Sequence, residues 1–195
     1  MQAMAVFSQS VETWTKWDVG VIDKANTARD VYYLTSDEKK VILLTNLART
    51  NGPLFAETFL KEFMKNKNSS RYSRSLERDL KDIRNLPLLY PRKDLFEKSK
   101  EHAQVSGKNG TTGHQNIGER VRPLLENYSI IAENCAYGFE KAFNNVIALL
   151  IDEGISDLGH RKNMLNEEFN SIGVSIQPHK RYDFNCVMTF GSILN

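Results

Sequence analysis

Two stretches near the C-terminus alternate apolar with polar residues, and they constrain the fold more than any other feature of the sequence. "SIGVSI" places Ile172, Val174 and Ile176 at every second position, and "DFNCVMTFG" repeats this alternation from Phe184 to Phe190. This period predicts β-strands, because successive side chains of a strand point to opposite faces. The polar segment "QPHKR" between them predicts an antiparallel hairpin. The chain is therefore expected to contain a small antiparallel sheet.

Most of the remaining chain is patterned for helices. Thr35 and Glu38 form a capping box that begins a helix, and "NGP" at 51–53 ends it. The segment "EKAFNNVIALLIDEG" carries an apolar stripe at helical spacing. Further helices are predicted over 53–65, near 71–84 and over 94–107. Many helices and few late strands favour the α+β class, with helices packed on a small antiparallel sheet.

The length of the chain predicts one domain after a short lead-in. With 195 residues the chain is long enough for a single sizeable core. Residues 1–35 are interpreted as a partly extended lead-in that packs on this domain through Trp14 and Trp17. Residues 36–195 are then the single domain.

Composition excludes several classes of protein. The net charge of +2, without a basic run interleaved with aromatic residues, indicates no nucleic-acid partner. No apolar segment approaches the ~18–20 residues of a transmembrane helix, and the start "MQAMAVFSQS" lacks the features of a signal peptide. The protein is therefore either cytosolic or a chain whose signal was removed. Cys135 and Cys186 are either two buried thiols or one disulfide.

Four residues are candidates for one functional site: His114, Glu133, Glu153 and His160. Two imidazoles that face each other across a cleft can hold one divalent cation, and two carboxylates can accept the remaining ring N–H groups. The softness of imidazole favours Zn²⁺ over Mg²⁺ in such a site. The same four groups could instead act as general acid and base on a substrate. Taken singly, each residue is equally well explained as an ordinary surface, capping or salt-bridged side chain.

The other two histidines fit this site less well. His102 is expected on the helix before the glycine turn, as a packing residue or a support for the site, and His179 is expected to be solvated in the hairpin turn. Sequence signatures of serine hydrolases, P-loop proteins, zincins and Rossmann folds are missing from the chain. No established catalytic motif therefore identifies an enzyme.

An ordered set of motifs resembles the CAP superfamily, which comprises cysteine-rich secretory proteins, antigen 5 and pathogenesis-related proteins of group one. The resemblance is strongest to the bacterial branch of SCP-like domains and covers roughly residues 36–195. The matching motifs, in chain order, are "SKEHAQVSGKNGTTGH", "AENCAYG", "GHRKNMLNEEFNSIGVSI" and "NCVMTFG". Residues 41–63 match the opening helix of the family more loosely. Ala132 stands where the family has the glycine of its Gly-Glu-Asn motif.

The resemblance implies a fold and a set of site residues. The fold is an α-β-α sandwich around an antiparallel sheet, with a cleft lined by two histidines and two glutamates. His114 and His160 match the histidines and Glu133 matches the motif glutamate, while Glu153 matches the second glutamate by its helix position alone. The expected metal ligands are then His114 and His160, with the two glutamates behind them.

The resemblance also implies a location and a class of function. A secreted protein is expected, so the chain would be extracellular, periplasmic or on the cell surface after removal of a signal peptide, and Cys135 and Cys186 would form a disulfide. The leading hypothesis is a binding module for a lipid, a cell-wall polysaccharide or a protein. The alternatives are a metal- or His/Glu-dependent hydrolase of peptide or ester bonds, and a structural surface protein with a residual cleft.

Overall fold

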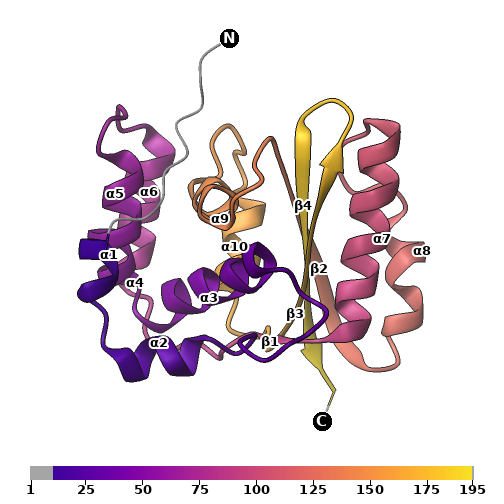
Figure 1. Cartoon of the computed structure of the whole chain (residues 1–195), viewed down its shortest axis with the longest axis horizontal. Helices are drawn as coiled ribbons and strands as arrows, with labels where there is room; N and C mark the ends of the chain where they lie inside the picture. Colours follow the sequence, from indigo (N-terminus) through magenta and orange to yellow (C-terminus); the bar gives the residue numbers. More distant parts are fainter. Residues whose placement is uncertain (1–10, 195) are drawn as a thin grey trace.

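A four-stranded sheet lies between two layers of helices in the computed structural model, which describes residues 11–194 (Figure 1). One face of the sheet is covered by α7 (Lys93–Asn109), and α8 (Ile117–Val121) follows on that side, continued by the short 3₁₀ helix η2 (Arg122–Leu124). The other face is covered by α3 (Ser36–Thr50), α9 (Ala142–Ile151) and α10 (Gly159–Leu165). The α+β class and the three-layer arrangement predicted from the sequence are confirmed.

The sheet runs in the order β1-β3-β4-β2. The hairpin of β3 (Ser171–His179) and β4 (Asp183–Ile193) is confirmed, with Val174 opposite Met188. The sheet is mixed rather than purely antiparallel, because the two-residue strand β1 (Tyr90–Pro91) pairs parallel to β3. That part of the prediction is wrong because two residues are too few to show any strand period.

The edge strand β2 (Tyr128–Tyr137) was not predicted from the sequence. It pairs antiparallel with β4 and is buried on both faces from Glu133 to Ala136. A strand that is buried on both faces shows no clean alternation of apolar and polar residues, so its period is hidden.

The N-terminal segment is helical rather than extended. Residues 11–25 form α1 (Val11–Thr15) and α2 (Val19–Ala25), while residues 1–10 of the predicted lead-in lie outside the described residues. Trp17 is buried and donates its indole N–H to the hydroxyl of Thr58 at 3.2 Å. The described part of the segment thus packs on the body, and the division of the chain at residue 35 stays a prediction.

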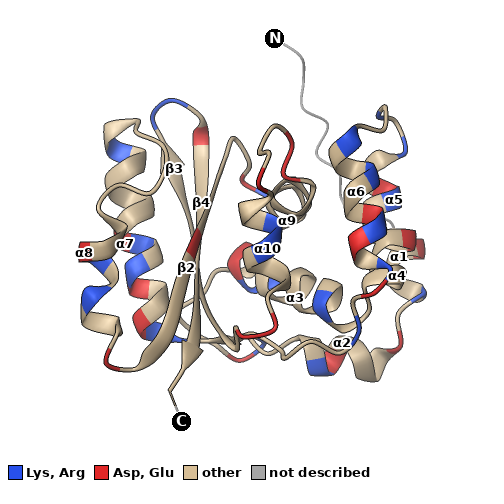
Figure 2. Cartoon of the chain, turned by 180° about the vertical axis from the view of Figure 1, so that it is seen from behind, with Lys and Arg blue, Asp and Glu red and all other residues tan. Residues whose placement is uncertain are grey.

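The remaining predicted helices are present with adjusted ends. The capping box at Thr35 and Glu38 begins α3. Residues 52–64 form α4 (Gly52–Phe55), the π-helix η1 (Ala56–Leu60) and α5 (Lys61–Met64) in succession, and α6 (Arg71–Leu80) follows. The exposed residues of α6 include Arg71, Arg74 and Arg78 together with Glu77 and Asp79, and basic and acidic positions alternate along its ribbon (Figure 2).

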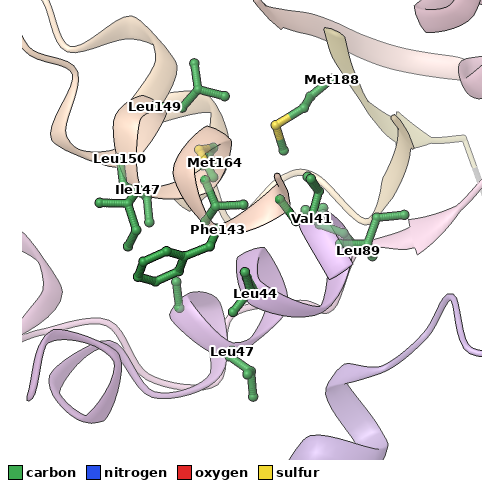
Figure 3. Close-up of a cluster of buried hydrophobic side chains, with 14 of the residues drawn as sticks. Val41, Leu44, Leu47, Leu89, Phe143, Ile147, Leu149, Leu150, Met164 and Met188 are labelled. Carbon is green, nitrogen blue, oxygen red and sulfur yellow. The ribbon is translucent and has the colours of Figure 1, made fainter. Parts of the chain in front are cut away.

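The main core lies between the sheet and the layer of α3 and α9. Val41 and Leu44 of α3 meet Phe143 and Ile147 of α9, and Met188 closes the cluster from β4 (Figure 3). Fully burying such side chains stabilises the fold by about 1.5–3 kcal/mol each.

The second helical layer approaches the sheet backbone closely. A Cβ atom added at Gly173 of β3 would lie 2.1 Å from the carbonyl carbon of Leu95 and 2.2 Å from the nitrogen of Phe96. Only glycine leaves room for α7 at this point. At its other end α7 leads into the loop that carries His114.

The structure contradicts the predicted disulfide. Cys135 and Cys186 are both free and buried. Cys186 pairs with Ala136 across the ladder while Cys135 pairs with Val187, so the two thiols lie on opposite faces of the sheet. Cys135 packs beside Ala103 of α7, whereas Cys186 belongs to the main core on the other side.

In the part of the chain that the structure describes, no helix has both the length and the hydrophobicity that crossing a membrane requires.

Candidate functional site

His114 lies in the loop between α7 and α8, and a buried carboxylate holds its ring. Nδ1 of His114 is 3.0 Å from Oε1 of Glu133, a residue of β2. The His114 side chain is 41% exposed, whereas that of Glu133 is fully buried. The ring is thus anchored on its inner side and open to solvent on the other.

Glu133 is shared between His114 and an arginine that the sequence did not identify. Nη1 and Nη2 of Arg120 donate to the two carboxylate oxygens at 2.8 and 2.9 Å. Burial alone would raise the pKa of Glu133, but the hydrogen bonds from His114 and Arg120 and the charge of Arg120 outweigh it and lower the pKa to about 2. Glu133 is therefore a carboxylate at neutral pH, so it accepts a hydrogen bond from the protonated Nδ1 of His114.

His160 begins α10, and its ring is held by Asp152. Nδ1 of His160 lies 2.7 Å from Oδ1 of Asp152, while Oδ2 of Asp152 accepts the backbone N–H of His160 at 2.9 Å. Asp152 follows the last residue of α9 in the left-handed conformation, with φ of +58°. This conformation is tolerated by Asp and turns its side chain toward the start of α10.

The two histidines face each other. Their ring centroids are 6.5 Å apart, with an angle of 44° between the ring planes. In each ring Nδ1 is bound by a carboxylate, so Nε2 is the nitrogen left for another partner. The structure thus brings His114, Glu133 and His160 together in one site, with Asp152 as the fourth member.

Glu153 lies beside this site with a different partner. Its Oε2 accepts the hydroxyl proton of Ser70 at 2.6 Å, at the N-terminus of α6. The position next to the site follows from the sequence, but the carboxylate that orients His160 is that of Asp152. A role of Glu153 in ligand or metal binding stays a prediction.

The fit of a metal ion to the two histidines can be judged from the distance between their rings. Zinc lies about 2.0–2.1 Å from a coordinating imidazole nitrogen, which puts the centroids of two coordinating rings roughly 5–6 Å apart. The 6.5 Å between the centroids of His114 and His160 exceeds this range, so the two rings would have to move slightly closer together to hold one ion. With that approach the two anchored imidazoles supply two ligands, and the remaining coordination positions are left to water or another ligand.

A second group could also hold a metal by distance alone. His102, Glu133 and Cys135 are buried and bring three potential ligand atoms within 4.8 Å of one another. Both oxygens of Glu133 are already bound by Arg120, and burial raises the pKa of the Cys135 thiol well above its usual value. A metal ion in this group would have to displace the bonds between Arg120 and Glu133, which favours the histidine pair as the metal site.

A mainly apolar cavity of about 390 Å³ opens beside His160. Its wall includes Phe63, Met64, Leu149 and Ile151, while His160 lines its polar end. The histidine pair thus lies next to a space that could accept an apolar group.

The sequence missed Asp152 and Arg120 as members of the site. The acidic pair Asp152-Glu153 was visible, but only the left-handed turn at Asp152 decides which carboxylate reaches His160. No motif in the sequence around Arg120 indicates a role in the site.

His179 is predicted from the sequence to be solvated, but it is buried. Its Nε2 donates to the carbonyl of Thr111 at 2.9 Å, and its Nδ1 accepts backbone N–H groups of its own turn.

Comparison with known proteins gives a family match. The model of the cysteine-rich secretory protein family, CAP, matches residues 44–190, well over half of the chain. No curated protein sequence matches the chain.

Three solved structures illustrate the structural likeness. An outer surface protein of Borrelia burgdorferi is 22% identical with a TM-score of 0.48, over 71% of this chain and 96% of that one. Venom allergen-like protein 4 of Schistosoma mansoni is 12% identical with a TM-score of 0.48, over 83% and 92%. A cysteine-rich secretory protein of Staphylococcus aureus is 16% identical with a TM-score of 0.46, over 82% of this chain but only 40% of that one. At these values the likeness carries no functional argument.

Proposed function

The chain belongs to the cysteine-rich secretory protein (CAP) family, and on this premise we propose that it is a binding module that holds a divalent metal ion between His114 and His160. The observation that carries the proposal is the matched anchoring of the two rings. Nδ1 of His114 lies 3.0 Å from the carboxylate of Glu133, and Nδ1 of His160 lies 2.7 Å from the carboxylate of Asp152. In both rings Nε2 is therefore the nitrogen left for the metal. Carboxylates in this position fix the ring orientation and raise the basicity of the ligand.

The proposed metal is Zn²⁺ rather than Mg²⁺. Imidazole nitrogen suits zinc and related transition metals, whereas Mg²⁺ prefers oxygen ligands. With two protein ligands, a bound zinc ion would supply a Lewis-acidic centre for an oxygen or nitrogen atom of the ligand. His114 and His160 hold the ion, and Glu133 and Asp152 orient the two rings.

The neighbouring cavity favours a lipid over a polysaccharide among the ligands expected from the sequence. Phe63, Met64, Leu149 and Ile151 are among its lining residues, and these apolar side chains gain free energy by burying hydrocarbon. The polar residues of the same wall, which include Lys67, Ser73 and Glu153, can contact the polar part of the ligand. We therefore propose a ligand whose apolar part enters the cavity and whose polar end lies at His160. The hydrolase and structural-protein alternatives stay predictions.

Calorimetry with ZnCl₂ and with MgCl₂ tests the metal site. We expect wild type to bind Zn²⁺ more tightly than Mg²⁺, and His114→Ala and His160→Ala each to weaken Zn²⁺ binding by at least roughly tenfold. Cys135→Ala is the control, because it removes the thiol of the buried group and leaves both histidines. Unchanged Zn²⁺ affinity in the double histidine variant would remove the metal proposal, and a loss confined to Cys135→Ala would move the site to the buried group.

A fluorescent fatty acid tests the cavity. Ala148→Trp places a large side chain in its wall, whereas Asn144→Trp adds the same side chain to α9 outside the residues that line it. We expect the first variant to lose binding of the probe and the second to retain it. Equal binding by both variants would show that the apolar group sits elsewhere.

We also propose that the protein acts outside the cytoplasm, as the name of its family suggests. The test is fractionation of cells that express the natural gene, with detection by an antibody against the folded domain. Recovery in the cytosolic fraction alone would contradict this part of the proposal.

A further inference from the structure

The loop that carries His114 is held at one residue by two side chains from different layers. The backbone N–H of Gly113 donates to the hydroxyl of Tyr137 at 2.8 Å. The backbone carbonyl of Gly113 accepts from Nε2 of His102, also at 2.8 Å. His102 comes from α7 and Tyr137 from β2, so the glycine immediately before His114 is fixed from both sides.

Gly113 needs such support because of its backbone conformation. Its φ is +91°, a region that glycine enters without steric cost but that is one of several open to it in a flexible loop. The conformation that brings His114 to Glu133 is therefore selected by contacts rather than by the local sequence. The two bonds to Gly113 are contacts of this kind.

Both supporting side chains are themselves well fixed. His102 is 3% exposed, and its Nε2 also lies 3.8 Å from Oε1 of Glu133. The ring of Tyr137 packs against those of His179 and Tyr182, with centroids 5.4 and 5.6 Å away. Displacement of either side chain would cost packing as well as a hydrogen bond.

We propose that His102 and Tyr137 are positioning residues for His114, which act by holding both backbone groups of Gly113 and so set the His114 ring on Glu133. The inference rests on the proposed role of His114 as a metal ligand. Neither residue is one of the two proposed metal ligands. They keep Nδ1 of His114 on the carboxylate and thereby keep Nε2 turned to its other partner.

The first test uses metal-free protein, so it does not depend on metal binding. Long-range ¹H–¹⁵N spectra of the imidazole rings report the tautomer of His114, and amide exchange reports the N–H of Gly113. We expect wild type to hold the Nδ1–H tautomer. In Tyr137→Phe the exchange of the Gly113 amide should rise at least about tenfold, and the His114 ring should shift toward a mixture of tautomers.

Two further variants separate positioning from general loss of structure. Tyr182→Phe removes a hydroxyl from the ring that packs on Tyr137, and it should leave the tautomer of His114 unchanged. His102→Leu removes the donor to Gly113 and should disturb His114, whereas His102→Gln retains a side-chain N–H and should restore most of the wild-type spectrum. Thermal unfolding of each variant identifies any that fails to fold.

The second test is the affinity for Zn²⁺. We expect Tyr137→Phe and His102→Leu to bind Zn²⁺ about 10–100-fold more weakly than wild type, with Tyr182→Phe unchanged. An unaltered His114 tautomer in both Tyr137→Phe and His102→Leu would overturn the positioning role whatever the metal does. Altered tautomers together with unaltered, His114-dependent Zn²⁺ affinity would overturn its link to metal binding. If His114→Ala binds Zn²⁺ as wild type does while the tautomer shifts as expected, the proposed metal site fails and the positioning of His114 stands.

Discussion

Glu133 and Asn134 are neighbours on the edge strand β2, and each holds one histidine of the site. Oε1 of Glu133 lies 3.0 Å from the ring of His114, and the side-chain amide of Asn134 donates to the backbone carbonyl of His160 at 2.9 Å. Successive side chains of a strand point to opposite faces, so the two residues reach into different helical layers. The histidines therefore meet across the free edge of the sheet.

This relationship makes the site sensitive to the geometry of one strand. Asn134 is fully buried, and its side-chain oxygen Oδ1 accepts a hydrogen bond from Nδ2 of Asn163 on α10 at 2.8 Å. The start of α10 is thus fastened to β2, while the loop before α8 is fastened to the same strand through Glu133. A shift of β2 by one residue would exchange these two roles and dismantle the site.

The first prediction concerns the acidic pair at the end of α9. Asp152→Asn should weaken Zn²⁺ binding by roughly 10–100-fold, because the amide no longer anchors Nδ1 of His160 as a carboxylate does. Glu153→Gln is the matched control, since its carboxylate bonds Ser70 instead. Calorimetry of the two variants beside wild type checks this. A larger loss in Glu153→Gln than in Asp152→Asn would restore Glu153 to the role expected from the sequence.

The second prediction is a pH-dependent loss of stability in Glu133→Gln. The pKa of Glu133 is lowered from 4.5 to about 2 in the folded protein, so the carboxylate stabilises the fold above pH ~4.5 and this contribution is lost as the pH falls toward 2. A shift of this size corresponds to about 3 kcal/mol at neutral pH.

Urea unfolding at pH 7 and at stepwise lower pH measures this effect. The variant should be less stable than wild type by about 3 kcal/mol at pH 7, and the gap should narrow as the pH falls below ~4.5. A difference in stability that stays constant over this pH range would show that folding does not lower the pKa of Glu133.

The third prediction is that both cysteines are reduced and slow to react. Burial raises the pKa of both thiols, and a thiol reacts as its thiolate. Mass spectrometry after alkylation without a reducing agent should find few modified cysteines in the native protein and two in the urea-denatured protein. Denatured protein that resists alkylation until a reductant is added would show a disulfide and contradict the placement of the two residues on opposite faces.

The fourth prediction is that Gly173 does not tolerate a methyl group. Gly173→Ala puts a Cβ atom 2.1 Å from the backbone of α7, and relief of this clash should cost about 1–3 kcal/mol of unfolding free energy or more. Gly118→Ala is the control, because a Cβ there meets nothing within 4 Å and the residue lies in α8. Alanine in a helix is favoured over glycine by roughly 0.5–1 kcal/mol, so this variant should be as stable as wild type or more so. Equal destabilisation of the two variants would argue against the close approach of α7.

The sequence by itself determined the helices with clear caps, the C-terminal hairpin and the candidates for the site. The capping box at Thr35 and Glu38 and the alternation along 171–190 are local signals, because each depends on residues a few positions apart. The ordered motifs likewise predicted His114, Glu133 and His160 as candidates for one site, and the structure places these three side chains close together.

Only the tertiary structure decided which atoms meet. Asp152 rather than Glu153 binds His160 because the chain adopts a left-handed conformation at Asp152. The two cysteines stay apart because the strand register pairs Cys186 with Ala136 instead of Cys135, which puts the thiols on opposite faces of the sheet. Arg120 contacts Glu133, and His102 and Tyr137 contact Gly113. Each of these contacts joins two segments, and the sequence pattern of one segment does not predict its position relative to the other. Local periodicity shows which face of an element is buried. The partners of a side chain depend instead on the orientation and position of elements that are distant in the sequence. In this protein the edge strand β2 fixes the positions of both histidines.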